Sequence, residues 1–114
     1  MQPCAPLNNK LNAFVEVAYE RACQAAIVAD SEMSKNHYRG PLHGIPLGIK
    51  DLCFIEQQIT GVGSLAFKNH RPDYTAEIVT TLSQAGAINL GRLALTEGAY
   101  AEYGYAQAIP KNPW

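Results

Sequence analysis

The chain has 114 residues and a net charge of −1 at pH 7, and 47% of its residues are hydrophobic. This length suits one small domain or a piece of a larger one, with enough apolar residues for a core. The near-neutral charge and the lack of any run of Lys and Arg argue against direct binding of nucleic acid. The charged fraction of 17% is below the usual quarter, which favours a surface that more protein covers.

The cysteines and histidines give no sign of a metal site or a cofactor. Cys4, Cys23 and Cys53 are widely spaced and form no Cys-x-x-Cys pair, so neither a disulfide framework nor a zinc site is indicated. Three reduced thiols fit a cytosolic protein. The N-terminus lacks the pattern of a signal peptide, and the longest apolar run, residues 25–29, is far too short to span a bilayer. We therefore expect a cytoplasmic location, with no cofactor, no metal and no membrane segment.

The first predicted element is a long helix over residues 9–35. Asn8 or Asn9 can cap its start, and Leu7 can act as a hydrophobic staple. Charged side chains such as Glu16 lie on the opposite, solvated side. An apolar stripe at this spacing is typical of packing against a core. Its members are Leu11, Phe14, Ala18, Ala22, Ala25, Ala29 and Met33.

Residues 40–51 read Gly-Pro-Leu-His-Gly-Ile-Pro-Leu-Gly-Ile-Lys-Asp. The two prolines forbid a helix because each removes an amide donor and clashes with the preceding turn. Alternation of Ile45, Leu47 and Ile49 predicts a tight loop that feeds a short buried strand. His43 in this loop is expected to be solvated or hydrogen-bonded to backbone.

Lys50 would lie where this apolar strand ends. A lysine that loses part of its hydration in such a place can act as a general base. The simpler alternative is a strand-end lysine whose amine reaches water, with Asp51 as a surface neighbour. The residues alone leave both interpretations open.

Two glycine-containing motifs near Lys50 fail as nucleotide-binding signatures. Residues 61–64, Gly-Val-Gly-Ser, are not a dinucleotide fingerprint, because Ala66 stands where the third glycine belongs. Residues 44–50 are not a phosphate-binding Walker loop, because no glycine immediately precedes the lysine. Cys53, flanked by apolar residues with no His or Asn placed to activate it, is interpreted as a small core residue rather than a nucleophile.

A second helix is predicted over residues 72–86. Asp73 or Thr75 can cap its start, and Gly86 ends it. Residues 87–91 then form a short strand. A strand, a helix and a strand of these lengths are typical of an α/β unit.

Residues 40–51 closely match the pattern G-P-L-x-G-[IV]-P-x-x-[IV]-K-D. The chain thereby resembles the amidase signature family, the serine hydrolases that cleave carboxamides, in the segment that bears the family's lysine. Residues 61–64 resemble a Thr-x-x-Gly-Ser turn, and residues 76–92 resemble a helix followed by an Ala-Gly-Ala-x-x-x-Gly-[KR] strand. Residues 95–99 resemble a Glu-Gly-Ala segment, and the final Asn-Pro-Trp resembles the Asn-Pro-[WF] that immediately precedes the family's glycine-serine loop. The similarity runs over residues 11–114, in the family's order.

The resemblance implies an α/β fold in which helices cover a mixed sheet, incomplete in this chain. Residues 1–114 would be the N-terminal portion of an amidase signature domain. The resemblance assigns to Lys50 the base of a Ser-cisSer-Lys triad, in which a bridging serine relays the proton and a second serine attacks the amide carbon. Both serines belong to a segment that would follow Trp114, so we expect the 114-residue chain alone to hydrolyse no amide. The serines that match neither motif are Ser31, Ser34, Ser64 and Ser83.

Two classes of function follow from this resemblance. The first is an enzyme that acts on a small-molecule amide together with the remainder of the domain, with a homodimer as an option. Within this class, a general carboxamide hydrolase is favoured over the A subunit of a glutamyl-tRNA(Gln) amidotransferase. The second is a non-catalytic, truncated product that acts as an interaction module. It predicts an exposed apolar surface where the rest of the sheet would pack.

Overall fold

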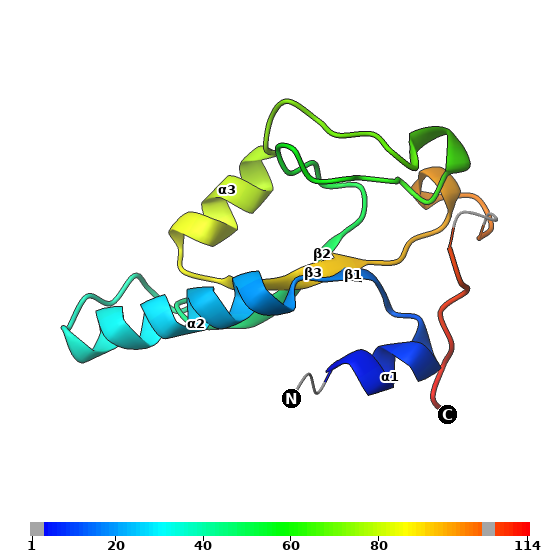
Figure 1. The fold of residues 1–114 in the computed structure, drawn as a ribbon. Helices are drawn as coiled ribbons and strands as arrows, with labels where there is room; N and C mark the ends of the chain where they lie inside the picture. Colours follow the sequence, from blue (N-terminus) through cyan, green and yellow to red (C-terminus); the bar gives the residue numbers. More distant parts are fainter. Residues whose placement is uncertain (1–3, 104–106) are drawn as a thin grey trace.

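The computed structural model describes residues 4–103 and 107–114. These residues form a small mixed sheet with helices around it (Figure 1). Two short 3-10 turns, Leu65–Phe67 and Glu97–Ala99, lie in the connections. In chain order the helices and strands are α1 (Cys4–Leu11), β1 (Phe14–Val17), α2 (Tyr19–Ser34), β2 (Pro46–Lys50), α3 (Glu77–Gln84) and β3 (Ile88–Leu93).

The last strand lies in the middle of the sheet. The strand order is β1-β3-β2, with β1 antiparallel and β2 parallel to β3. Close approach of β1 requires a glycine in β3, because a Cβ on Gly91 would lie 2.1 Å from the carbonyl oxygen of Glu16. Gly91 also has a φ of +144°, which side chains other than glycine rarely adopt. The mixed sheet and the α/β class are as predicted.

The single long helix over residues 9–35 was a wrong prediction. The chain forms α1 instead, turns at Asn12 with a φ of +53°, and runs through β1 before α2 begins. Asn8 does not cap a helix: its side chain exchanges two hydrogen bonds with the backbone of Phe14, at 2.7 and 3.0 Å. Residues 14–17 are aromatic or β-branched at three of four positions, which suits a strand, and β3 supplies the partner.

The remaining elements largely follow the prediction. Of the alternating residues before Lys50, Leu47 and Ile49 lie in β2 and Ile49 is buried there, whereas Ile45 precedes the strand and is exposed. The second helix is shorter than expected: α3 begins after Ala76, and no side chain caps its start. Thr75 does not cap it: the Thr75 hydroxyl accepts a hydrogen bond from the amide of Glu56. Gly86 ends the helix at a φ of +83°, as predicted, and leads into β3.

The core is small and centres on the packing of α2 against β3. Figure 1 shows α3 on one side of the sheet and α1 on the other, with the C-terminal segment beside α1. Large apolar side chains remain exposed on α2, among them Ile27 and Met33. Within the described ranges, no helix has the length and apolar character needed to cross a bilayer. The buried apolar residues are Ala18, Ala22, Ala29, Ile49, Val79, Ile88, Ala94 and Leu95.

Candidate functional site

Lys50 is the last residue of β2, as predicted, and it pairs with Leu93 at the end of β3. Its Nζ donates a hydrogen bond of 2.6 Å to the carbonyl oxygen of Ala94. The residue is otherwise exposed to solvent. The amine therefore has a defined place beside the segment that follows β3, where a reacting group can reach it.

Asp51 is buried, with an exposed fraction of 4%, and is not the surface neighbour of the simpler alternative. Its Oδ1 lies 3.4 Å from Nε of Arg92, which is itself only 6% exposed. The amide of Gly61 donates to Oδ2 at 3.2 Å. Burial raises the pKa of the Asp51 carboxyl, and the positive charge of Arg92 and the Gly61 amide act in the opposite direction.

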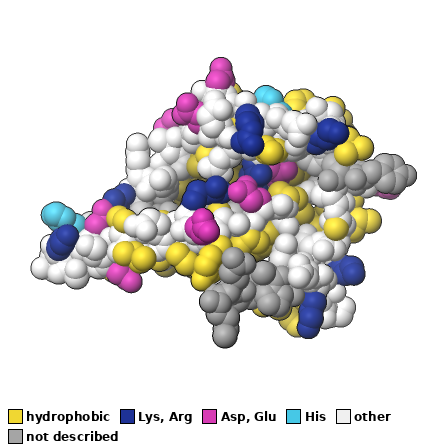
Figure 2. All heavy atoms as spheres, viewed as in Figure 1, with side chains coloured by type: hydrophobic (Ala, Val, Ile, Leu, Met, Phe, Trp, Pro, Cys, Tyr) yellow, Lys and Arg dark blue, Asp and Glu magenta, His cyan; other side chains and the backbone are white. Residues whose placement is uncertain are grey.

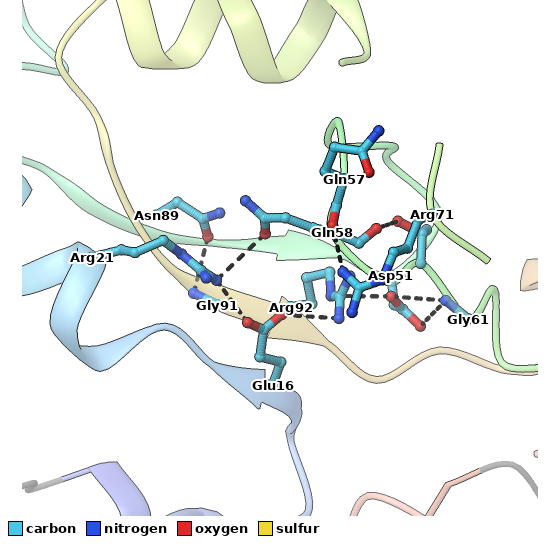
Figure 3. Close-up of polar contacts among 11 residues, drawn as sticks. Glu16, Arg21, Asp51, Gln57, Gln58, Gly61, Arg71, Asn89, Gly91 and Arg92 are labelled. Atoms are coloured by element: carbon cyan, nitrogen blue, oxygen red, sulfur yellow. Dashed lines mark hydrogen bonds and ion pairs between the residues drawn. The ribbon is translucent and has the colours of Figure 1, made fainter. Parts of the chain in front are cut away.

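The charged contacts continue across the sheet to β1 and α2 (Figure 3). Nη2 of Arg92 lies 2.9 Å from Oε2 of Glu16, and Oε1 of Glu16 lies 2.7 Å from Nη2 of Arg21. Glu16 thus joins two arginines instead of lying on a solvated helix face. Among the described residues, Nη1 and Nε of Arg92 have no hydrogen-bond partner, so the 3.4 Å contact of Nε with Asp51 is an ion pair without a hydrogen bond. We call Asp51, Arg92, Glu16 and Arg21 the sheet-end network.

A pocket of about 770 Å³ lies beside the sheet-end network. Figure 2 shows acidic and basic side chains gathered over the middle of this face, with apolar side chains beneath them. In the part of the chain that the structure describes, Lys50 is not among the lining residues. Besides the four residues of the network, the lining includes Gln57, Gln58, Gly61, Ser64, Lys68 and Arg71.

A second group of charged residues lies at the opposite ends of the parallel strands. His43 is buried in the loop before β2, where its Nδ1 accepts a hydrogen bond of 3.2 Å from the amide of Arg39. Its Nε2 lies 3.0 Å from Oε2 of Glu32, which also pairs with the Arg39 guanidinium. The hydrogen bond from Arg39 lowers the pKa of Glu32. The backbone hydrogen bond predicted for His43 is present, but the side chain is not solvated. We call Glu32, Arg39 and His43 the helix-end cluster.

The turn after Lys50 forms a wall close to the lysine. A Cβ on Gly63 would lie 2.9 Å from the carbonyl oxygens of Leu95 and Thr96, so the turn packs directly on the segment after β3. The Ser64 hydroxyl accepts a hydrogen bond from the amide of Ala66 and has a local capping role. Cys53 is partly exposed. No three His, Cys, Asp or Glu side chains converge as metal ligands in residues 4–103 and 107–114.

The sequence interpretation missed the sheet-end network. Arg92 lies within the run that forms β3, and Glu16 lies between two valines. A charged residue inside an apolar strand pattern is a signal from which buried partners could have been predicted. Which charges would meet depends on the pairing of strands that are far apart in the sequence.

Comparisons with known proteins place these features in a family. The family model described as Amidase matches residues 1–114. The chain is 43% identical over 108 residues to the Mycobacterium bovis protein named "Putative amidase AmiD", covering 95% of this chain and 23% of that protein. It is 34% identical over 109 residues to the A subunit of the glutamyl-tRNA(Gln) amidotransferase of Anaeromyxobacter dehalogenans, covering 94% of this chain and 22% of that protein.

Solved structures agree with these relatives. The native peptide amidase of Stenotrophomonas maltophilia is 40% identical with a TM-score of 0.69, over 76% of this chain and 18% of that one. A chain of an inhibitor-bound vestigial complex, described as revealing the evolutionary origins of an s-triazine catabolic enzyme, is 33% identical with a TM-score of 0.77, over 84% and 21%. This chain therefore spans only about a fifth of the length of the proteins it matches. With the family match over all 114 residues, it belongs to the Amidase family.

Proposed function

We propose that the protein is an amidase that hydrolyses carboxamide C–N bonds, with Lys50 as the base of a Ser-cisSer-Lys triad. Residues 1–114 would then be the N-terminal portion of an amidase signature domain. One observation carries the proposal. Lys50 of the family's lysine motif lies at the carboxyl end of β2 with its amine placed at the Ala94 carbonyl. Family membership and the 43% identity to AmiD support the assignment.

In this mechanism the Lys50 amine accepts a proton from the bridging serine. That serine accepts the proton of the nucleophilic serine as the latter attacks the amide carbon. The same relay then returns a proton to the leaving amine and activates the water that releases the acyl group. Both serines would come from the Gly/Ser-rich segment that the resemblance places after Trp114. The substrate is a small-molecule amide, and the cysteine pattern supports a cytoplasmic location.

The test uses the protein that includes the serine segment, assayed for ammonia release from simple carboxamides. Lys50→Ala is expected to lower kcat by several orders of magnitude, because members of a triad act as a unit. Lys35→Ala is the matched control, since Lys35 is an exposed lysine at the end of α2. Full activity of Lys50→Ala would refute the proposed role.

A second candidate is the A subunit of a glutamyl-tRNA(Gln) amidotransferase. Identities of 34–37% to several proteins with this name favour it. The two candidates differ in what the protein needs for turnover. An amidase releases ammonia from a free carboxamide by itself. The amidotransferase component needs its partner subunits and a charged tRNA, so activity that appears only on their addition would replace the first candidate by the second.

A further inference from the structure

We propose that Asp51 is the positioning residue for the Lys50 amine. Its buried ion pair with Arg92 fixes the end of β2 against β3, so that Nζ of Lys50 stays at the Ala94 carbonyl. The catalytic meaning of this role rests on the proposed function of Lys50. The placement of the amine can be tested without any turnover.

The backbone of Asp51 is the first part of this arrangement. Its amide donates to the carbonyl oxygen of Leu93 at 3.0 Å, which continues the β2–β3 pairing one residue beyond Lys50. Its own carbonyl oxygen accepts from the amide of Val62 at 3.1 Å. Asp51 is therefore held on both sides, by the central strand and by the turn that follows the lysine.

The carboxylate of Asp51 is the second part. It contacts Arg92, which lies two residues before Ala94 on the same segment, and it accepts from the amide of Gly61. Glu16 holds Nη2 of the Arg92 guanidinium at 2.9 Å from the β1 side, which limits any swing of the arginine. The pair thus links the residue after Lys50 to the strand that leads to the acceptor of the lysine amine.

These contacts indicate that Asp51 positions Lys50 and does not itself transfer a proton. The Lys50 amine donates to the Ala94 carbonyl, whereas the Asp51 side chain contacts Arg92 and Gly61. Asp51 is nearly inaccessible to solvent. It therefore acts on Lys50 through the backbone geometry of the two strands, without taking a proton from the substrate.

Reductive methylation of the chain, followed residue by residue with mass spectrometry, tests the placement. In Asp51→Asn, which keeps the shape of the side chain and loses its charge, we expect the rate at Lys50 to rise several-fold. The other four lysines serve as internal references: Lys10, Lys35, Lys68 and Lys111. An unchanged rate at Lys50, or an equal rise at all five lysines, would overturn the proposal.

Arg92→Lys gives a second, milder variant for the case in which Asp51→Asn does not fold. It keeps the positive charge but loses the fork of donors that reaches both Asp51 and Glu16. The expected rise at Lys50 is smaller and equally selective. A rate at Lys50 equal to that of the unmodified sequence would contradict the role of the Asp51–Arg92 pair.

Kinetics of the protein with the serine segment connect the placement to catalysis. Asp51→Asn is expected to lower kcat at least tenfold with little change in KM, because a displaced base slows the chemical step and leaves substrate binding intact. Glu32→Gln is the matched control, since Glu32 also pairs with an arginine but lies in the helix-end cluster. Unchanged kcat in Asp51→Asn, with Lys50→Ala inactive, would refute the positioning role alone. Full activity of Lys50→Ala would refute the proposed function, and the methylation rates would still test the placement.

Discussion

The sheet-end network and the helix-end cluster are built from similar groups but differ in their environment. Each pairs a carboxylate with an arginine, which is close in the sequence for Glu32 and Arg39 and far away for Asp51 and Arg92. Asp51 and Arg92 are both nearly inaccessible to solvent, whereas Glu32 and Arg39 keep 25% and 39% of their side-chain surface. The pKa of Asp51 is raised by burial, and that of Glu32 is lowered by the hydrogen bond from Arg39.

The difference indicates that burial determines how much stability is lost when one partner of an ion pair is removed. An exposed pair contributes little, because water already solvates both partners. A buried pair requires both charges to give up their hydration, so the loss of one partner leaves the other uncompensated. Within the sheet-end network the buried Asp51–Arg92 pair is therefore the contact most sensitive to substitution, and Asp51 directly follows Lys50.

The largest expected effect is the loss of Arg92. Arg92→Met leaves the carboxylates of Asp51 and Glu16 without their shared partner, and we expect the free energy of unfolding to fall by about 3–5 kcal/mol. Urea denaturation measures it. Arg39→Met in the helix-end cluster is the control and should cost much less. Equal losses in the two variants would remove the distinction between the two sites.

An intermediate effect is expected at His43, the buried member of the helix-end cluster. His43→Ala removes the acceptor of the partly buried Arg39 amide, and the net loss of such a hydrogen bond is about 0.5–1.5 kcal/mol. The exposed His37 gives a control, since His37→Ala should leave stability unchanged. A neutral effect of His43→Ala in urea denaturation would show that solvent replaces the lost contact.

The pH dependence should have opposite signs at the two sites. Because the pKa of Asp51 is raised in the folded state, its contribution to stability is present below the unfolded pKa of about 3.9 and is lost as pH rises through the folded pKa. Because the pKa of Glu32 is lowered, its contribution is present above the unfolded pKa of about 4.3 and is lost as pH falls through the folded pKa. Unfolding of Asp51→Asn and Glu32→Gln, measured against the unmodified sequence from pH 3 to pH 7, should give differences of opposite slope. Slopes of the same sign would contradict this.

The smallest effect is the response to salt. Added salt screens exposed pairs and acts much less on buried ones. The small loss caused by Glu32→Gln should therefore shrink further at 1 M NaCl, whereas the loss caused by Arg92→Met should persist. Thermal unfolding at low and high salt makes the comparison. A loss at Arg92 that disappears in salt would indicate that solvent reaches the sheet-end network.

Local patterns predicted the elements that local chemistry determines. The prolines and the alternation before Lys50 specified β2, and Gly86 specified the end of α3. The segment Phe14–Val17 was interpreted as helix because its apolar spacing also fits a helical stripe. Its strand exists because it pairs with β3, with Phe14 opposite Leu93. Tertiary pairing overrode the local pattern there.

The dependence on tertiary strand pairing also explains which parts of the candidate site could be predicted from the sequence. Lys50 could be found from its motif, because the residues that define it are consecutive. Asp51 and Arg92 are 41 positions apart, and their contact depends on the parallel register of β2 and β3. A pattern of single residues carries no information on that register, so the partner of Asp51 became visible only in the folded chain.

The central position of β3 has a consequence for synthesis on the ribosome. β1 and β2 each pair with β3, so a nascent chain that ends before Ile88 holds two strands without the strand that joins them. The sheet can close only after Ile88–Leu93 has left the exit tunnel, and such late, long-range pairing is slow. During that interval the apolar residues of β1 and β2 are available to chaperones, and premature release before β3 would yield a chain unable to build its core.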